Sequence, residues 1–135
     1  MALMRWSDKF SVGVPTMDKQ HMVLFDSLND LHAAMMKGQA QSLTGPLLRK
    51  LVAYTRDHFS AEEAMMSAAE YPSLPAHRIK HREFEKQVGE YVGRFERGEI
   101  TLNLDLLNFL RDWLVTHIQG EDRKYGPLAN ERGCR

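Results

Sequence analysis

Five of the six histidines in the chain lie at spacings that are typical of metal ligands. Two polar pairs are four residues apart, His58 with Glu62 and His77 with His81. Residues four apart lie on the same face of a helix, about 5–6 Å from each other at Cβ. Each pair can therefore serve one metal centre. The full candidate set is His21, His58, Glu62, His77, His81, His117 and Asp122.

The number and the type of these side chains indicate a pair of transition-metal ions. Seven ligands are too many for one ordinary zinc or iron ion. Imidazole with carboxylate favours iron, while the ligand types alone leave zinc, copper and manganese open. A single buried histidine is more often a hydrogen-bonded core residue. Five histidines and two carboxylates at one site would be costly to satisfy by hydrogen bonds alone, so the sequence predicts metal binding.

The step from His117 to Asp122 does not fit a regular helix. Five residues rotate a side chain by roughly 140° around an ideal helix axis. We therefore expect the helix to be distorted or to end near Gly120, so that Asp122 folds back toward the other ligands. Glu62 and Asp122 are the two candidates for carboxylates that bridge both ions.

Four segments with helical apolar spacing must position these ligands, and glycine and proline residues separate them. We expect helices at about 18–37, 45–69, 75–97 and 102–119, with an extended N-terminal arm at 1–17 and a C-terminal segment at 120–135. The short connections predict an all-α fold, an up-down-up-down antiparallel four-helix bundle that forms one domain over residues 1–135. In this topology all the candidate ligands lie at the same end of the bundle.

The remaining polar side chains near the ligands are interpreted as structural. His32 lies eleven residues after His21, about 16 Å along the helix axis and out of reach of the site. Glu63 is expected to point away from Glu62 into solvent. Asp18 is expected to cap the first helix or to complement its dipole. The eight methionines are interpreted as adaptable core residues.

The composition excludes several classes of protein. The 135 residues include 18 Lys and Arg and 18 Asp and Glu, so the formal charge is zero and favours neither nucleic acid nor an anionic membrane as partner. The only cysteine, Cys134, cannot form an internal disulfide. No apolar run reaches membrane-spanning length, and residues 1–6 lack the apolar core of a signal peptide. We expect a soluble cytoplasmic protein.

The chain resembles the bacteriohemerythrins, single-domain bacterial relatives of the hemerythrin oxygen carriers. The resemblance covers nearly the whole length, and no candidate ligand departs from the family pattern. The stretches that carry it are Trp6 with 12–14, 18–21, 58–63 with Met66, 77–81, and 113–118 continuing through Asp122 to Tyr125.

The resemblance implies how the ligands are divided between two iron ions per chain. One iron would be bound by His77, His81 and His117. The other would be bound by His21 and His58. Glu62 and Asp122 would bridge the irons together with a solvent-derived oxo or hydroxo group. The resemblance further implies that O2 binds end-on at an open position of the two-histidine iron, in a pocket lined by Leu24, Phe59, Trp113, Leu114 and Ile118.

The function implied by the resemblance is reversible O2 binding at a non-heme di-iron centre, for oxygen carriage, storage or delivery. Nitric oxide or small anions are further candidates for the open iron. One alternative is a sensor of oxygen, redox state or nitric oxide that acts through a separate partner protein. Another is a di-iron enzyme with peroxidase or NO-reducing activity. The Glu-x-x-His pairs of ferritin-like carboxylate proteins are absent, so we predict a protein that is not an enzyme, with at most weak side activity.

Overall fold

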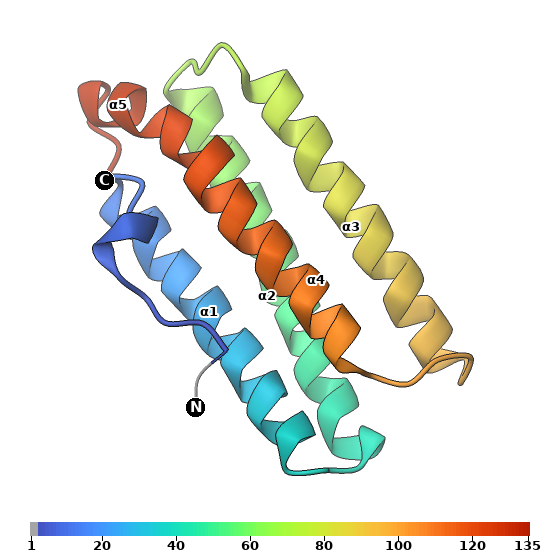
Figure 1. The fold of residues 1–135 in the computed structure, drawn as a ribbon. Coiled ribbons are helices and arrows are strands. Elements are labelled where there is room, and N and C mark those ends of the chain that lie inside the picture. The colour runs from blue at the N-terminus through green and yellow to red at the C-terminus, as the bar shows by residue number, and fades with distance from the viewer. Residues whose placement is uncertain (1–2) are drawn as a thin grey trace.

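The computed structural model describes residues 3–135, and every regular element among them is helical (Figure 1). Residues 1 and 2 of the predicted arm lie outside the described part. A short 3-10 turn, η1, precedes the bundle at Asp8–Phe10. The bundle helices are α1 (Pro15–Met36), α2 (Gln41–Ala68), α3 (Leu74–Glu96) and α4 (Leu104–His117). A π-helical turn, η2 (Ile118–Asp122), and the helix α5 (Arg123–Glu131) complete the chain.

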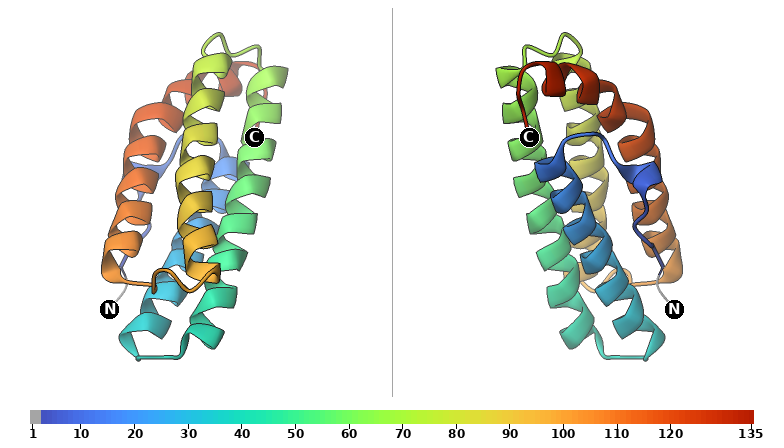
Figure 2. Two further views of the ribbon diagram at one scale, coloured as in Figure 1. Left: turned by 90° about the vertical axis from the view of Figure 1, so that its right-hand side faces the viewer. Right: turned by 90° about the vertical axis from the view of Figure 1, so that its left-hand side faces the viewer.

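The four long helices form the antiparallel up-down-up-down bundle that the sequence predicts, and the all-α fold class is confirmed. The start of α1, the end of α2, the start of α3 and the end of α4 lie at one end, where α5 folds across the bundle (Figures 1 and 2). None of the helices within residues 3–135 is long and apolar enough to span a membrane.

Two helices begin earlier than the apolar pattern suggested. Helix α1 begins at Pro15 because proline is well suited to the first helical position, where its missing N–H would have no helical partner. Helix α2 begins at Gln41 and continues through Pro46, a residue that the sequence analysis treated as a breaker. Pro46 lies in the second turn, so the helix loses a single backbone hydrogen bond near its start.

The N-terminal arm packs along the bundle beside α1 and α4 (Figure 2). The side chain of Asn29 in α1 accepts from the backbone N–H of Met4 and donates to its carbonyl, both at 2.8 Å. Asp18 accepts from the backbone N–H of Val12 at 2.9 Å and from the hydroxyl of Ser11 at 2.6 Å. Asp18 does not cap α1 with its side chain, but it lies in the first turn, where a carboxylate complements the helix dipole. Its hydrogen bonds also fasten the arm to this turn.

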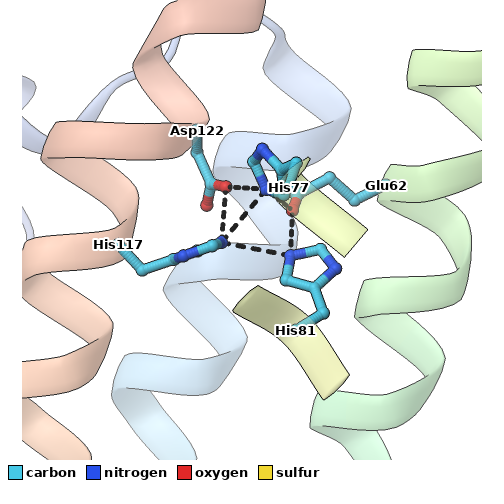
Figure 3. Close-up of side chains that lie close together, drawn as sticks. All are labelled: Glu62, His77, His81, His117 and Asp122. Atoms are coloured by element: carbon cyan, nitrogen blue, oxygen red, sulfur yellow. Dashed lines mark hydrogen bonds and ion pairs between the residues drawn. The ribbon is translucent and has the colours of Figure 1, made fainter. Parts of the chain in front are cut away.

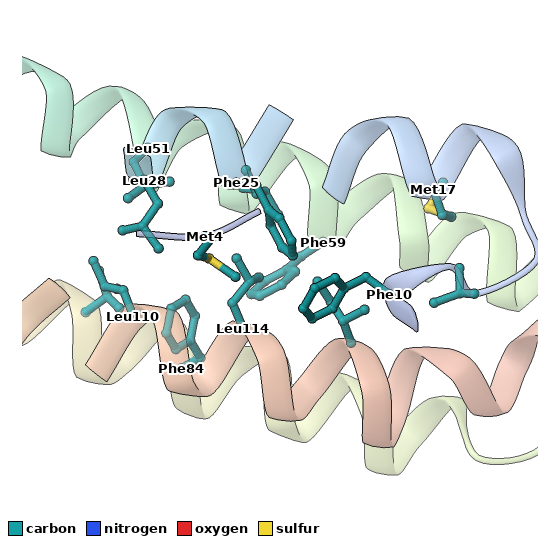
Figure 4. Close-up of a cluster of buried hydrophobic side chains, with 14 of the residues drawn as sticks. Met4, Phe10, Met17, Phe25, Leu28, Leu51, Phe59, Phe84, Leu110 and Leu114 are labelled. Carbon is teal, nitrogen blue, oxygen red and sulfur yellow. The ribbon is translucent and has the colours of Figure 1, made fainter. Parts of the chain in front are cut away.

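The core is built from apolar side chains that the arm and all four helices contribute (Figure 4). Phe84 of α3 stacks on Trp113 of α4, with ring centroids 3.9 Å apart. At the ligand end, α5 lies so close to the arm that a Cβ on Gly126 would be 2.1 Å from the carbonyl oxygen of Val12. Only glycine allows this approach. The contact therefore fixes the C-terminal segment that follows the last candidate ligand.

Candidate metal centre

All seven residues predicted as ligands lie together inside one end of the bundle, and each is at most 4% exposed. They come from the N-terminal parts of α1 and α3, the C-terminal part of α2, the last residue of α4 and the turn η2. Their ligand atoms form two groups, within each of which all atoms lie within 4.8 Å of one another. The larger group is Glu62, His77, His81, His117 and Asp122 (Figure 3), and the smaller is His21, His58, Glu62 and Asp122.

Three imidazoles of the larger group point their Nε2 atoms at one another. The Nε2 of His117 lies 3.1 Å from that of His81 and 3.1 Å from that of His77. Glu62 Oε1 is 3.0 Å from His81 Nε2, and Asp122 Oδ1 is 3.0 Å from His117 Nε2. Three nitrogen and two oxygen donors therefore surround one point.

The smaller group uses the other oxygen of each carboxylate. His21 Nε2 is 3.4 Å from Glu62 Oε2 and 3.2 Å from Asp122 Oδ2. His58 Nε2 is 3.3 Å from Glu62 Oε2. Each carboxylate thus directs one oxygen to each group, which is the arrangement that a bridge between two metal ions requires.

The protein's own hydrogen bonds do not satisfy these donors. Both ring nitrogens of His21, Nδ1 of His77, Oε1 of Glu62 and Oδ1 of Asp122 are buried without a hydrogen-bond partner in the described chain. Two Nε2 atoms that face each other at 3.1 Å can share only one proton. Such a buried set is costly unless a cation lies between the lone pairs, so the residues fit a pair of metal ions.

The electrostatics of the metal-free side chains point the same way. Burial lowers the pKa of His21 and of His77, but the adjacent carboxylates of Asp122 and Glu62 outweigh it and raise both pKa values to about 9. Burial alone would raise the pKa of Glu62, yet the surrounding histidines hold it well below its usual range. Without metal, protons on the histidines compensate the two carboxylates, and a metal ion would displace them.

The turn η2 explains how Asp122 reaches the site. Residues 118–122 form a π-helical turn in place of continued α-helix. In a π-turn a residue aligns with the fifth after it, so His117 and Asp122 lie on the same side. The predicted distortion near Gly120 is confirmed, and the side chain of Asp122 is 1% exposed.

Three side chains that the sequence analysis did not assign also contact the candidate ligands. Gln20 Oε1 lies 2.6 Å from Nδ1 of His58, and the hydroxyl of Tyr125 donates to Oε2 of Glu62 at 2.8 Å. Glu63 lies 2.8 Å from Nδ1 of His81. The expectation that Glu63 points into solvent is wrong, since the residue is only 7% exposed. In the sequence, Gln20 and Glu63 are marked by their adjacency to the ligands and by the stretches 18–21 and 58–63 that carry the family resemblance.

Two of the five residues expected to form an apolar pocket stack on candidate ligands. The ring of Phe59 stacks on His81 at 3.8 Å, with 2° between the planes, and Trp113 stacks on His117 at 4.3 Å. Leu24, Leu114 and Ile118 are buried, while Trp113 is half-buried. His32, in contrast, lies outside both groups and is partly exposed.

Comparison with known proteins identifies relatives along nearly the whole chain. Residues 12–129 match the hemerythrin HHE cation binding domain. A bacteriohemerythrin of Stenotrophomonas maltophilia is 38% identical over 93% of this chain and 80% of its own length. A bacteriohemerythrin of Methylococcus capsulatus is 36% identical over 96% of this chain and 99% of its own.

Solved structures show the same architecture. A crystal structure of wild-type hemerythrin superposes with a TM-score of 0.91 at 36% identity, covering 95% of this chain and 98% of that chain. The crystal structure of an alanine mutant of a hemerythrin gives a TM-score of 0.92 at 35% identity, over 96% and 98% of the two chains.

Proposed function

The chain belongs to the hemerythrin family, and on that premise we propose that it binds O2 reversibly for oxygen carriage, storage or delivery. Proteins of this family hold a di-iron centre, so the chain is a di-iron O2-binding protein rather than an enzyme. We assign the ligands as the two groups of donors suggest: His77, His81 and His117 on one iron, His21 and His58 on the other, and Glu62 and Asp122 on both.

The observation that carries this proposal is the unequal size of the two groups. One has five donor atoms and the other four, although both share the same pair of carboxylates. The group with fewer donors leaves more of its surroundings free for a small ligand. When bound, the di-iron centre supplies the two electrons needed to hold O2 reversibly. The protein's part is to keep the two positions unequal.

Apolar side chains next to the site support binding of a small neutral molecule. A cavity of about 20 Å³ is lined by Leu24, Leu28, Leu51, Thr55, Phe84, Leu110 and Leu114. Leu24 and Leu114 each lie three residues from a candidate histidine, as do Thr55 and Phe84, so the cavity forms the layer of the bundle next to the ligands. We assign the O2 pocket at the two-histidine iron to Leu24, Phe59, Trp113, Leu114 and Ile118. These side chains exclude water and protons and so favour release of intact O2.

An oxygenation cycle tests the proposal. The iron-loaded protein is reduced without oxygen, exposed to O2 and then purged, while its visible spectrum and iron content are recorded. We expect two irons per chain and a charge-transfer band that appears with O2 and disappears on purging. Irreversible conversion to the diferric spectrum would contradict oxygen carriage and favour a sensor or an enzyme.

A pair of histidine variants tests the ligand assignment. His58→Ala removes one of the two nitrogen donors from the smaller group, so we expect the iron content to fall from two ions per chain toward one. His32→Ala is the matched control, because His32 lies on α1 outside both groups and should leave two irons in place. Equal iron content in both variants would contradict the assignment of His58.

A further inference from the structure

Glu63 occupies a position in α2 that connects the protein surface with the larger group of donors. Its Oε2 lies 2.8 Å from Nδ1 of His81. Arg82 donates from one nitrogen to both oxygens of Glu63, at 2.6 and 2.7 Å, and Nε of Arg78 donates to Oε1 at 3.0 Å. Both arginines are about half exposed, while the side chain of Glu63 is 9% exposed. Two surface cations therefore hold one buried carboxylate against His81.

Two arginine guanidinium groups donate three hydrogen bonds to the oxygens of Glu63, at 2.6 to 3.0 Å. This geometry favours a carboxylate, because guanidinium groups are permanent cations and a carboxylate accepts charge-assisted hydrogen bonds. A carboxylate can only accept, so Nδ1 of His81 must carry the proton and donate it to Glu63. The Nε2 lone pair of His81 is then free to face the metal position, where Glu62 Oε1 and His117 Nε2 lie at 3.0 and 3.1 Å.

Packing holds the ring of His81 in this orientation. The ring of Phe59 lies parallel to it, with centroids 3.8 Å apart and 2° between the planes. The edge of the imidazole is fixed by Glu63 and one face is covered by Phe59. Rotation of the ring would break the hydrogen bond to Glu63 and the stacking at once.

His81 differs in this respect from His21, His58 and His77. Nδ1 of His58 meets the neutral side-chain oxygen of Gln20. Nδ1 of His21 and Nδ1 of His77 have no hydrogen-bond partner in the described chain. Among the side-chain contacts of these rings at Nδ1, only that of His81 is a carboxylate. Glu63 therefore gives His81 an anionic hydrogen-bond acceptor that His21, His58 and His77 do not have at Nδ1.

We propose that Glu63 is a positioning residue that sets the tautomer of His81 and, through it, lowers the reduction potential of the iron that His81 binds. A histidine that donates its second N–H to a carboxylate is a stronger donor and stabilises the more highly charged metal ion. Arg78 and Arg82 hold Glu63 in place from the surface. The inference rests on the ligand assignment proposed above, and it concerns the redox balance of the centre rather than oxygen binding itself.

Two substitutions at Glu63 separate its charge from its hydrogen bond. Glu63→Gln keeps an acceptor for Nδ1 of His81 but removes the charge, so the protein should retain two irons while its reduction potential rises. Glu63→Leu removes both, so iron should be lost as well. The potential is measured by spectroelectrochemical titration of the diferric protein. The exchangeable N–H proton of His81 is followed by NMR of the same samples.

Glu85→Gln is the matched control. Glu85 accepts from the other terminal nitrogen of Arg82 at 2.7 Å but does not contact His81, so the potential should remain at the wild-type value. Arg82→Gln removes a positive charge that partly neutralises Glu63, so the potential should fall below the wild-type value. This opposite shift decides the question if the Glu63 variants do not fold, and a rise in potential would contradict the proposal. An unchanged potential in Glu63→Gln, or the same shift in Glu85→Gln, would overturn the proposal.

A failure of the role proposed for Glu63 can be told apart from a failure of oxygen carriage. Iron-loaded protein that does not release O2 reversibly would contradict oxygen carriage, yet the potential of Glu63→Gln relative to wild type would still decide the role of Glu63. Reversible oxygenation with an unchanged potential in Glu63→Gln would leave carriage in place and refute the role of Glu63.

Discussion

At the scale of single residues, Glu62 and Asp122 organise the site. Both are almost fully buried, and each directs its two oxygens toward different groups of histidines. A buried carboxylate is stable only when opposite charge or hydrogen bonds surround it. Tyr125 donates one hydrogen bond to Glu62, and the surrounding histidines hold the pKa of its carboxyl group well below the usual range. In the metal-free protein, protons on the histidines balance the negative charge of these two carboxylates. In the metal-bound protein, the same negative charge can balance the positive charge of two metal ions.

Proton release on metal binding follows from the raised pKa values of His21 and His77. Both values are about 9, so at pH 7.5 in the metal-free protein both rings are protonated on both nitrogens and positively charged. A metal ion needs the lone pairs, so we expect release of about two protons per chain at pH 7.5 from these two rings, falling toward zero at pH 10. Calorimetric titration with Zn²⁺ in buffers of different ionisation enthalpy measures this number. No release at pH 7.5 would contradict the prediction.

At the scale of elements, the turn η2 decides which way Asp122 points. An α-helix aligns a residue with the fourth after it, whereas a π-turn aligns it with the fifth. Residues 118–122 therefore contain one residue more than a regular helix would need between His117 and Asp122. Gly120 lies in this turn on the exposed side, where a Cβ would meet no atom within 4 Å.

Deletion and insertion at Gly120 test this account of the turn. Deleting Gly120 gives a four-residue step from His117 to the aspartate, which a regular α-helix aligns, so we expect two irons per chain to be retained. Inserting one alanine after Gly120 gives a six-residue step and turns the aspartate away, so we expect iron to be lost. Iron content and helicity by circular dichroism are measured for both proteins. Retention of iron after the insertion would contradict the account.

At the scale of the whole molecule, the antiparallel order brings four distant segments to one end of the bundle. Seven polar side chains then replace apolar core at that end. The arm and α5 cover this end through the close approach of Val12 and Gly126, while the apolar core fills the rest of the bundle. Metal binding and folding are therefore linked, because the donors converge only in the folded chain.

Removal of the metal should lower the thermal stability of the whole bundle. A ligand that binds only the folded state, at a concentration far above its Kd, stabilises it by about 4 kcal/mol, which corresponds to a shift in Tm on the order of 10 °C for a domain of this size. We expect a decrease of this order after chelation, measured by circular dichroism. Adding Fe²⁺ back without oxygen should restore the Tm. An unchanged Tm after complete removal of iron would contradict the link.

The sequence by itself determined the fold class and the identity of the candidate donors. Apolar residues at steps of three and four predicted the helices, and short connections predicted their antiparallel order. Once that order is given, the positions of His21, His58, His77 and His117 along their helices place them at the same end. The five-residue step to Asp122 also predicted a distorted helix. These features depend on local spacing and chain topology, which the sequence contains directly.

Only the tertiary structure decided the contacts around the donors. Glu63 and Glu62 are adjacent and chemically alike, yet Glu62 points between both groups of histidines while Glu63 reaches His81 and two arginines of α3. The partners of Glu63 lie 15 to 19 residues further along the chain, on another helix. Their meeting depends on how α2 and α3 are rotated about their axes. Packing of the complete core sets this rotation of the helices. The spacing of residues along one helix does not encode it.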